Sequence, residues 1–290
     1  MATAVPATAP APDALPLRPR APARSPMAWL STVIVGACGV FLLAPLLNLL
    51  VWAFSQSWFF PAALPTVWTL KWFGYVFAQA HLTQAIIYSL TLAPTVTLVS
   101  ALICWPAAYA IGRAQFPGRR FVTVFILAAN AFPQFGIYIS LATLMYALNL
   151  IATFPGVVIV QLLGTLVTMT WIPAAAFASV PVTLEEAARD SGAGPFRTFL
   201  RVTLPLAMPG LLTALVLAFL AAFDESQGTL LIGVPNIVTM PVMMYSLVTG
   251  YSEPVAAVFS ILLAIPSLAL LLLIRRHLVQ GALASGFTLI

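Results

Sequence analysis

Long apolar stretches recur along the chain, and they limit what it can fold into. Six of them come close to or exceed the roughly 20 residues that an α-helix needs to cross about 30 Å of hydrocarbon. Within lipid each stretch has to satisfy its own backbone hydrogen bonds, so we expect helices and not isolated strands. The predicted helices cover residues 29–54, 83–111, 121–148, 157–180, 207–222 with an extension to 224, and 255–274.

The amino-acid composition indicates that lipid covers most of the surface. Of the 290 residues, 62% are hydrophobic and 7% are charged, whereas a soluble domain has roughly 25% charged residues. Twelve Lys and Arg and seven Asp and Glu residues are too few for a water-facing surface. We therefore expect an all-α integral membrane protein with about six transmembrane helices. Prolines inside the apolar stretches predict kinks at Pro45, Pro94, Pro133 and Pro266.

The basic residues predict the orientation of these helices. All twelve Lys and Arg residues except Lys71 lie before the first predicted helix, between the second and third, between the fourth and fifth, or at the end of the sixth. With six spans these positions share one face, which the positive-inside rule assigns to the cytoplasm together with both termini. The net charge of +5 thus reflects topology. We expect no nucleic-acid partner, because no basic surface is interleaved with aromatic residues.

The ends of the chain differ from its apolar centre. Residues 1–26 are rich in Ala and Pro without a periodic apolar face, which predicts a disordered cytoplasmic tail. A secretory signal is the alternative, but the apolar stretch that follows is longer than the roughly 7 to 15 residues of a signal core. We expect one transmembrane domain over residues 27–280, with a cytoplasmic connection at 182–205, and a short cytoplasmic tail over residues 281–290.

Few groups in the chain could perform catalysis or bind a metal. Cys38 and Cys104 lie within predicted helices, and His81 and His277 fall on opposite faces, so these side chains cannot form one metal site. The lysine of the chain follows Leu70, which excludes the Gly-Lys pair of a phosphate-binding Walker loop. We expect no catalytic residue, no metal and no cofactor in this chain.

The connection between the fourth and fifth predicted helices is charged and carries ordered helix signals. Thr183 and Glu186 have the spacing of a capping box, which predicts a helix over about residues 184–191. Gly192 can take the left-handed conformation that ends such a helix. The pair Gly194-Pro195 then predicts a second helix. The amide at the first position of a helix has no partner within the helix, so proline, which lacks that amide, fits there.

The second helix is expected to reach about residue 202, where Leu204 and Pro205 turn the chain into the next span. The small side chains of Ala187 and Ala188 keep the first helix slim, so that it could enter a groove on another protein. Charged side chains would form the rim of that contact, namely Glu185, Glu186, Arg189 and Asp190. A solvated connecting loop is the alternative. Such a loop would not need a helix cap, a glycine hinge and the start of a second helix.

The same connection resembles the EAA loop of permease subunits of binding-protein-dependent ABC importers. The matching residues are Glu186-Ala187-Ala188, Gly192 after three further residues, and Val202-Thr203-Leu204-Pro205 after nine more. The departure from the pattern is Val202, where the family usually has Ile. The resemblance implies the type I importer permease fold, with the following residues coupling the chain to an ATPase: Glu185, Glu186, Ala187, Ala188, Asp190, Gly192, Leu204 and Pro205.

The resemblance also implies partners and a location. A second permease subunit, identical or homologous, would lie beside this chain, and two ATPase subunits would bind ATP and Mg and receive the loops. A periplasmic or lipid-anchored binding protein would deliver the substrate, and the complex would lie in the bacterial inner membrane. Alternatives of another class are a stand-alone secondary transporter and an intramembrane enzyme, neither of which predicts the ordered connection.

After the fifth predicted helix, the sequence is similar in pattern to spermidine/putrescine, aminophosphonate and ferric-iron permeases. The matching features are the acidic pair after Phe223, the Gly-x-Pro of residues 233–235, the Met-Pro-Val before Tyr245, and Glu253-Pro254. This resemblance implies a small polar solute of polyamine or aminophosphonate type, with ferric iron or a sugar as alternatives.

Two acidic residues are candidates for the substrate pathway. Asp224 and Glu225 end the fifth apolar stretch, about 25 Å outward from its inner end. A carboxylate there could attract a cationic substrate, or both acids could lie at the water boundary or pair with a partner subunit. Gln134 and Trp171 are further candidates for the pathway.

Overall fold

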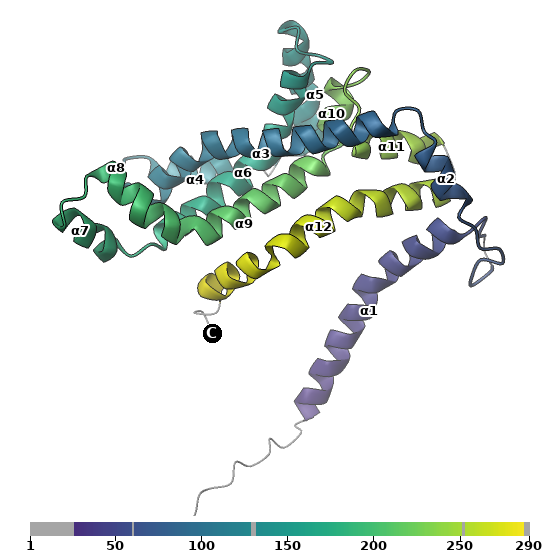
Figure 1. Cartoon of the computed structure of the whole chain (residues 1–290), viewed down its shortest axis with the longest axis horizontal. Helices are drawn as coiled ribbons and strands as arrows, with labels where there is room; N and C mark the ends of the chain where they lie inside the picture. Colours follow the sequence, from purple (N-terminus) through teal and green to yellow (C-terminus); the bar gives the residue numbers. More distant parts are fainter. Residues whose placement is uncertain (1–25, 60, 129–131, 251–252, 287–290) are drawn as a thin grey trace, which may run out of the picture. The chain divides into compact units, whose positions relative to one another are not determined.

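The computed structural model describes residues 26–59, 61–128, 132–250 and 253–286 (Figure 1). Within these ranges every regular element is a helix, apart from an isolated antiparallel bridge between Ser55 and Trp68. The all-α prediction is therefore confirmed. In chain order the helices are α1 (Pro26–Phe54), α2 (Lys71–Phe77), α3 (Leu82–Arg113), α4 (Arg119–Ala128), α5 (Gln134–Ala147), α6 (Phe154–Ala178), α7 (Val182–Asp190), α8 (Pro195–Thr198), a π-helix (Phe199–Thr203), α9 (Leu204–Phe223), α10 (Gln227–Ile232), α11 (Met240–Gly250) and α12 (Glu253–Gly286).

Five helices in the described part of the chain are long and apolar enough to cross a membrane. The third predicted span, residues 121–148, is instead divided into the shorter helices α4 and α5. Pro133 does not kink a continuous helix as predicted but stands before α5 as its N-cap, because proline can begin a helix more easily than continue one. The five candidate spans are Trp29–Phe54, Leu82–Arg113, Phe154–Ala178, Pro195–Phe223 and Glu253–Leu272.

The chain divides into two compact units after Asn48. The described part of the first unit is residues 26–48 of α1, an apolar helix whose described side chains, such as Phe41, are mostly exposed. Residues 1–25, which make up most of the predicted N-terminal tail, lie outside the described residues. At the other end α12 continues to Gly286, so residues 281–286 of the predicted C-terminal tail are helical.

The centre of the second unit is a bundle of α3, α6 and α9. Helix α3 packs most extensively against α6, and α9 packs against both (Figure 1). Helices α3 and α6 run in the same direction, because Ser100 shares a 2.5 Å hydrogen bond with Thr165 and the end of α3 reaches the end of α6. Helix α9 runs in the opposite direction, since its first residues pack against those two ends and its last residues against the other end of the bundle.

Glycines allow the three helices to approach closely. A Cβ atom added to Gly112 of α3 would lie 2.5 Å from the carbonyl oxygen of Ala174 in α6, and one added to Gly210 of α9 would lie 2.5 Å from the Cβ atom of Ala176. Small residues at helix crossings are the usual way for membrane helices to pack, because lipid provides no hydrophobic force between them. These contacts fix the positions at which α3 and α6 end and α9 begins.

Replacing Gly112 by alanine should therefore destabilise the bundle. The added methyl group meets a backbone oxygen, which cannot rotate away, and overpacking of this kind costs about 1–3 kcal/mol. The matched control is Gly164→Ala in α6, where the nearest atom to the new Cβ would be the Tyr138 hydroxyl at 3.6 Å. Thermal unfolding in detergent should show a lower midpoint for Gly112→Ala only. Equal midpoints for the two variants would contradict the close packing of α3 on α6.

Candidate functional site

Polar residues gather at opposite ends of the α3–α6–α9 bundle. The α7–α8 segment, residues 182–205, lies where α3 and α6 end and α9 begins, as Figure 1 shows for α7 and α8. The other group lies at the C-terminal end of α9, beside α5 and α10. The first group contains the residues predicted to couple to an ATPase, and the second contains most of those predicted for the substrate pathway.

Helix α7 begins two residues earlier than the sequence predicts. Its N-cap is Pro181, with φ −61° and ψ 126°, and no side chain caps the helix. The predicted capping box between Thr183 and Glu186 is wrong, because Thr183 lies inside the first turn. The fixed φ of proline already suits the residue that precedes a helix, so Val182 starts the helix without a hydroxyl cap.

Helix α7 ends as predicted, at a left-handed glycine. Gly192 has φ +84°, its amide donates to the carbonyl of Arg189 (2.8 Å), and the amide of Ala193 donates to the carbonyl of Ala188 (3.0 Å). This pair of bonds is a Schellman motif, in which two carbonyls at the helix end receive partners. The direction in which the chain leaves α7 is therefore fixed by backbone geometry.

The predicted turn at Leu204 and Pro205 is wrong, because the chain continues as a helix from Pro195 to Phe223. Pro195 starts α8 at its first position, as predicted. The chain then passes through one π-helical turn, in which the amide of Leu204 donates to the carbonyl of Phe199 five residues earlier. Single π-turns inside α-helices are frequent at functional sites, and this one comes just before Pro205, which has no amide to donate.

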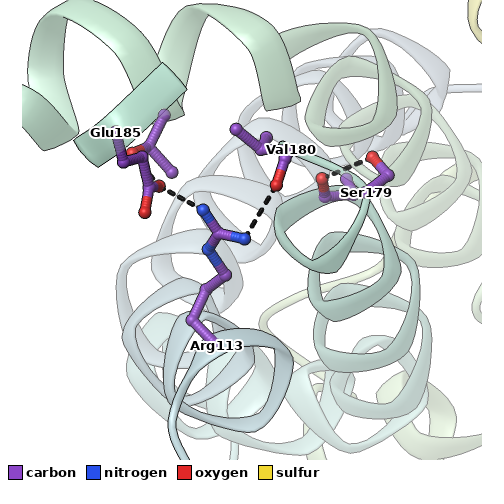
Figure 2. A network of polar contacts seen from close by, with 6 residues as sticks. Arg113, Ser179, Val180 and Glu185 are labelled. Carbon is purple, nitrogen blue, oxygen red and sulfur yellow. Dashed lines mark hydrogen bonds and ion pairs between the residues drawn. The ribbon is translucent and has the colours of Figure 1, made fainter. Parts of the chain in front are cut away.

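A buried ion pair joins α7 to the end of α3 (Figure 2). Glu185 is 5% exposed, and its Oε1 lies 2.5 Å from Nη2 of Arg113. The hydroxyl of Thr203, in the π-helix, donates to the same oxygen at 2.5 Å. Arg113 in turn donates through Nη1 to the carbonyl of Val180 (2.8 Å), just after α6. The prediction that Glu185 lies on an exposed rim is therefore wrong, because its carboxylate points into the bundle.

The other predicted coupling residues are distributed over the surface of the α7–α8 segment. Glu186, Ala187 and Asp190 are exposed and Ala188 is half-buried. Leu204 is half-buried against the bundle and Pro205 is exposed. Large apolar side chains are also exposed on this segment, namely Val182, Leu184, Phe196 and Leu200. The exposed side chains of α7 thus include both carboxylates and apolar groups.

At the other end of the bundle the two acidic residues after α9 have different environments. Glu225 accepts hydrogen bonds from the amides of Gly228 (2.6 Å) and Thr229 (3.0 Å) and from the Thr229 hydroxyl (2.6 Å). It therefore caps the start of α10. The Thr229 hydroxyl also accepts a bond from the buried Gln161 (2.8 Å). Asp224 is exposed, and its carboxylate has no hydrogen bond or ion pair among the described residues.

Asp224 faces a polar cavity of about 540 Å³. A second cavity, of about 360 Å³, lies against α11 and α12 and shares Leu220 and Asp224 with the first. Of the other predicted pathway residues, Gln134 lines the polar cavity, whereas Trp171 does not and lies 41% exposed on α6. The polar cavity is lined by Gln134, Tyr138, Gly164, Leu220, Ala221, Asp224, Glu225, Ser226 and Gln227.

Comparison with known proteins identifies the family to which this chain belongs. Residues 105–284 match the family described as the binding-protein-dependent transport system inner membrane component. The chain belongs to this family. The permease is therefore a multi-pass inner-membrane protein and a transport subunit, and the resemblance seen in its α7–α8 segment is confirmed at the level of the family.

Individual relatives support the same assignment. The permease is 30% identical over 272 residues to the trehalose transport system permease protein SugB of Mycobacterium tuberculosis, covering 89% of this chain and 95% of that protein. It is 30% identical over 204 residues to the trehalose/maltose transport system permease protein MalG of Thermococcus litoralis, covering 68% and 73%. A chain of the bacterial alginate ABC transporter, crystallised with an alginate pentasaccharide-bound periplasmic protein, has the same fold, with a TM-score of 0.65 and 20% identity over 87% of this chain and 94% of that one.

Sequence reasoning missed the partners of the acidic residues. Arg113 was counted only as a topology signal at the end of a span, and Thr203 only as part of a motif. An arginine at the end of one long apolar helix and an acidic residue in a later connection on the same predicted face are a signal that such a pair could form. Thr229 lies only four residues after Glu225, but its bond with Gln161 depends on how α10 packs on α6.

Replacing Gly192 should loosen the end of α7. The left-handed conformation costs about 1–2 kcal/mol for an L-residue with an ordinary side chain, whereas asparagine adopts it more readily. Gly192→Ala should increase amide hydrogen exchange over residues 182–195 about 5- to 30-fold, and Gly192→Asn should change it less. Equal exchange in the three proteins would show that the Schellman motif does not hold the helix end.

Acid should weaken the attachment of α7 through Glu185. Burial alone raises the pKa of this carboxyl, but contacts with Arg113 and Thr203 and the charges of Arg113 and Arg189 outweigh it and lower the pKa. A carboxyl whose pKa is lowered by folding stabilises the folded protein at pH values above its ordinary pKa of 4.5. This stabilisation is lost as the pH falls through the pKa of the folded state. The melting temperature of wild type should therefore fall relative to that of Glu185→Gln only as the pH drops below the ordinary pKa of Glu. The exposed Glu186→Gln should follow the wild-type profile, and a constant difference for Glu185→Gln would contradict the ion pair.

Proposed function

We propose that the permease forms the translocation pathway of an ABC importer for a carbohydrate, together with a second permease subunit. The supporting observation is that relatives covering most of the chain are named for sugars, among them trehalose, maltose and maltodextrin. A periplasmic or lipid-anchored binding protein would deliver the sugar from outside. This proposal replaces the polyamine or aminophosphonate substrate that the sequence pattern implied.

The site geometry favours a neutral polyol over a polyamine. The acidic pair after Phe223 was one of the features behind the polyamine hypothesis, but Glu225 is engaged by two amides and one hydroxyl of α10. The remaining carboxylate, Asp224, lies in a cavity with neutral amide and hydroxyl groups such as those of Gln134 and Ser226. A polycation in this cavity would meet one carboxylate without a protein partner, so much of its charge would stay uncompensated away from water, which is costly. Sugar hydroxyls can donate to the carboxylate and exchange bonds with the neutral groups.

We also propose that the α7–α8 segment faces the cytoplasm and docks on a partner ATPase subunit, which binds ATP and Mg. Exposed Leu184 and Phe196, 47% and 74% exposed, would be unfavourable in water but suit a groove on another protein. Glu186 and Asp190 would lie at the edge of that groove, and Ala187 would allow close approach. Leu204 and Pro205 are the first residues of α9, where Leu204 would hold the helix start on the bundle rather than touch the ATPase. A stand-alone transporter or an intramembrane enzyme would not need this surface.

Co-purification and reconstitution test this function directly. The permease should purify with an ATPase subunit and a second permease chain, and the complex in liposomes should hydrolyse ATP faster when its binding protein carries a sugar. Trehalose and maltodextrin are the first substrates to measure, with spermidine as the comparison. Uptake of spermidine without uptake of any sugar would overturn the carbohydrate assignment, and absence of an ATPase partner would overturn the coupling assignment.

Asp224 and Glu225 should differ when each is changed to its amide. Glu225→Gln removes the charge from three hydrogen bonds at the start of α10 and should lower the thermal stability, by about 1–3 kcal/mol. Asp224→Asn removes a carboxylate without a protein partner, so stability should stay at the wild-type value while sugar uptake falls about tenfold, equivalent to about 1.4 kcal/mol. Wild-type uptake by Asp224→Asn would remove this residue from the pathway.

A further inference from the structure

The attachment of α7 to the rest of the permease depends on a single buried side chain. Among the residues of α7, only Glu185 is buried. Its neighbours Glu186 and Leu184 point to the surface. Contacts between apolar side chains therefore contribute little to holding α7 on the bundle. The helix is held by its two chain connections and by the polar contacts of one carboxylate.

These contacts connect α7 to all three helices of the central bundle. Arg113 is the last residue of α3, and Thr203 lies in the π-helix that continues into α9. Arg113 also bonds the carbonyl of Val180, which follows the last turn of α6. In Figure 2 the guanidinium group of Arg113 lies between Glu185 and Val180. We call this set of contacts the α7 joint.

Directional bonds make the α7 joint suited to transmit movement. Apolar surfaces can slide on one another with little change in energy, whereas an ion pair and a hydrogen bond to the same oxygen restrict both its distance and its direction. Because Glu185 and Arg113 are almost completely enclosed, breaking the pair would leave a buried charge without compensation. The ends of α3 and α9 are thus constrained to move with α7.

Aromatic side chains connect the three helix ends beside the joint. Tyr109 of α3 packs edge-on against Phe177 of α6 and Phe199 of the π-helix, with ring centroids 5.4 Å and 5.2 Å apart. These edge-on contacts link the ends of α3, α6 and the π-helix, so movement of one helix end reaches the other two.

We propose that Arg113 and Glu185 are positioning residues that transmit the movement of α7 into the transmembrane bundle during transport. This inference rests on the proposed function, in which α7 docks on an ATPase subunit. The ion pair does not touch the ATPase or the substrate. It converts a displacement of the docked helix into a coordinated displacement of α3, α6 and α9. Loss of the pair therefore separates ATP hydrolysis from transport.

The test compares transport with hydrolysis in the reconstituted complex. The variants are Glu185→Gln, Arg113→Gln and the double variant, and Arg120→Gln, an exposed arginine of α4, is the matched control. Each variant complex is measured for bound ATPase subunit, ATP hydrolysis with loaded binding protein, and sugar uptake. Each joint variant should retain the ATPase subunit and basal hydrolysis, while sugar transported per ATP falls at least about fivefold, the lower end of typical coupling between sites.

The double variant distinguishes a joint from two independent effects. If Arg113 and Glu185 act as a pair, removing both should reduce transport per ATP no more than removing one. The Arg120→Gln complex should match wild type. An unchanged ratio of transport to hydrolysis in the joint variants, or additive losses in the double variant, would overturn the inference.

A milder variant covers the case in which loss of the ion pair prevents folding. Thr203→Val keeps the shape of the side chain and removes one hydrogen bond to Glu185, so it should assemble and still lower transport per ATP. If the charge variants do not fold and Thr203→Val keeps the wild-type ratio of transport to hydrolysis, the joint serves stability alone and the inference is overturned. Failure of the wild-type permease to bind any ATPase subunit would instead overturn the proposed function, and the inference with it.

Discussion

A carboxylate can be buried at the end of a helical bundle only if charge and hydrogen bonds compensate for the water it loses. Glu185 meets this condition through Arg113 and Thr203, and in doing so it ties α7 to α3 and to the start of α9. The geometry of the α7–α8 segment depends on this interaction. Without it, α7 would be connected to the bundle mainly through the chain at its two ends, because its other side chains are exposed or half-buried.

The two ends of the bundle use acidic residues in the same physical way. Glu225 is bound by the amides and hydroxyl at the start of α10, and Glu185 by a guanidinium and a hydroxyl. Glu185 holds α7 against the long helices, and Glu225 holds the start of α10, which Gln161 of α6 contacts through Thr229. Asp224 is different because no described group compensates its charge, which leaves it available to a ligand in the polar cavity. Of these three acidic residues, Glu185 and Glu225 are bonded to groups of the protein, whereas Asp224 lines the cavity without a partner for its carboxylate.

The central packing explains how the two ends are related. Helices α3, α6 and α9 approach closely at glycines such as Gly112 and Gly210, so they form a stiff unit that extends from α7 to the polar cavity. A change at one end of a tightly packed bundle cannot remain local, because the interior has little free volume to absorb it. This property connects the proposed docking surface to the proposed sugar site without any direct contact between them.

Much of this protein was determined by local sequence properties. Apolar stretches long enough to cross a membrane predicted an all-helical membrane protein, and the spacing of Glu186-Ala187-Ala188, Gly192 and Pro205 predicted the importer family. Gly192 and Pro195 act as predicted, because a left-handed helix end and a proline at the first helical position are decided by the backbone of a few neighbouring residues.

Tertiary structure decided which polar groups meet. Glu185 lies inside rather than at a rim, Pro205 follows a π-turn rather than a bend, and Glu225 caps a helix while Asp224 faces a cavity. The contacts of Glu225 are local, with groups three and four residues ahead of it, whereas the position of Glu185 depends on Thr203, 18 positions away, and on Arg113 of another helix. Local patterns contain no information on such pairings, because the energy of a buried charge is set by the groups that fold around it.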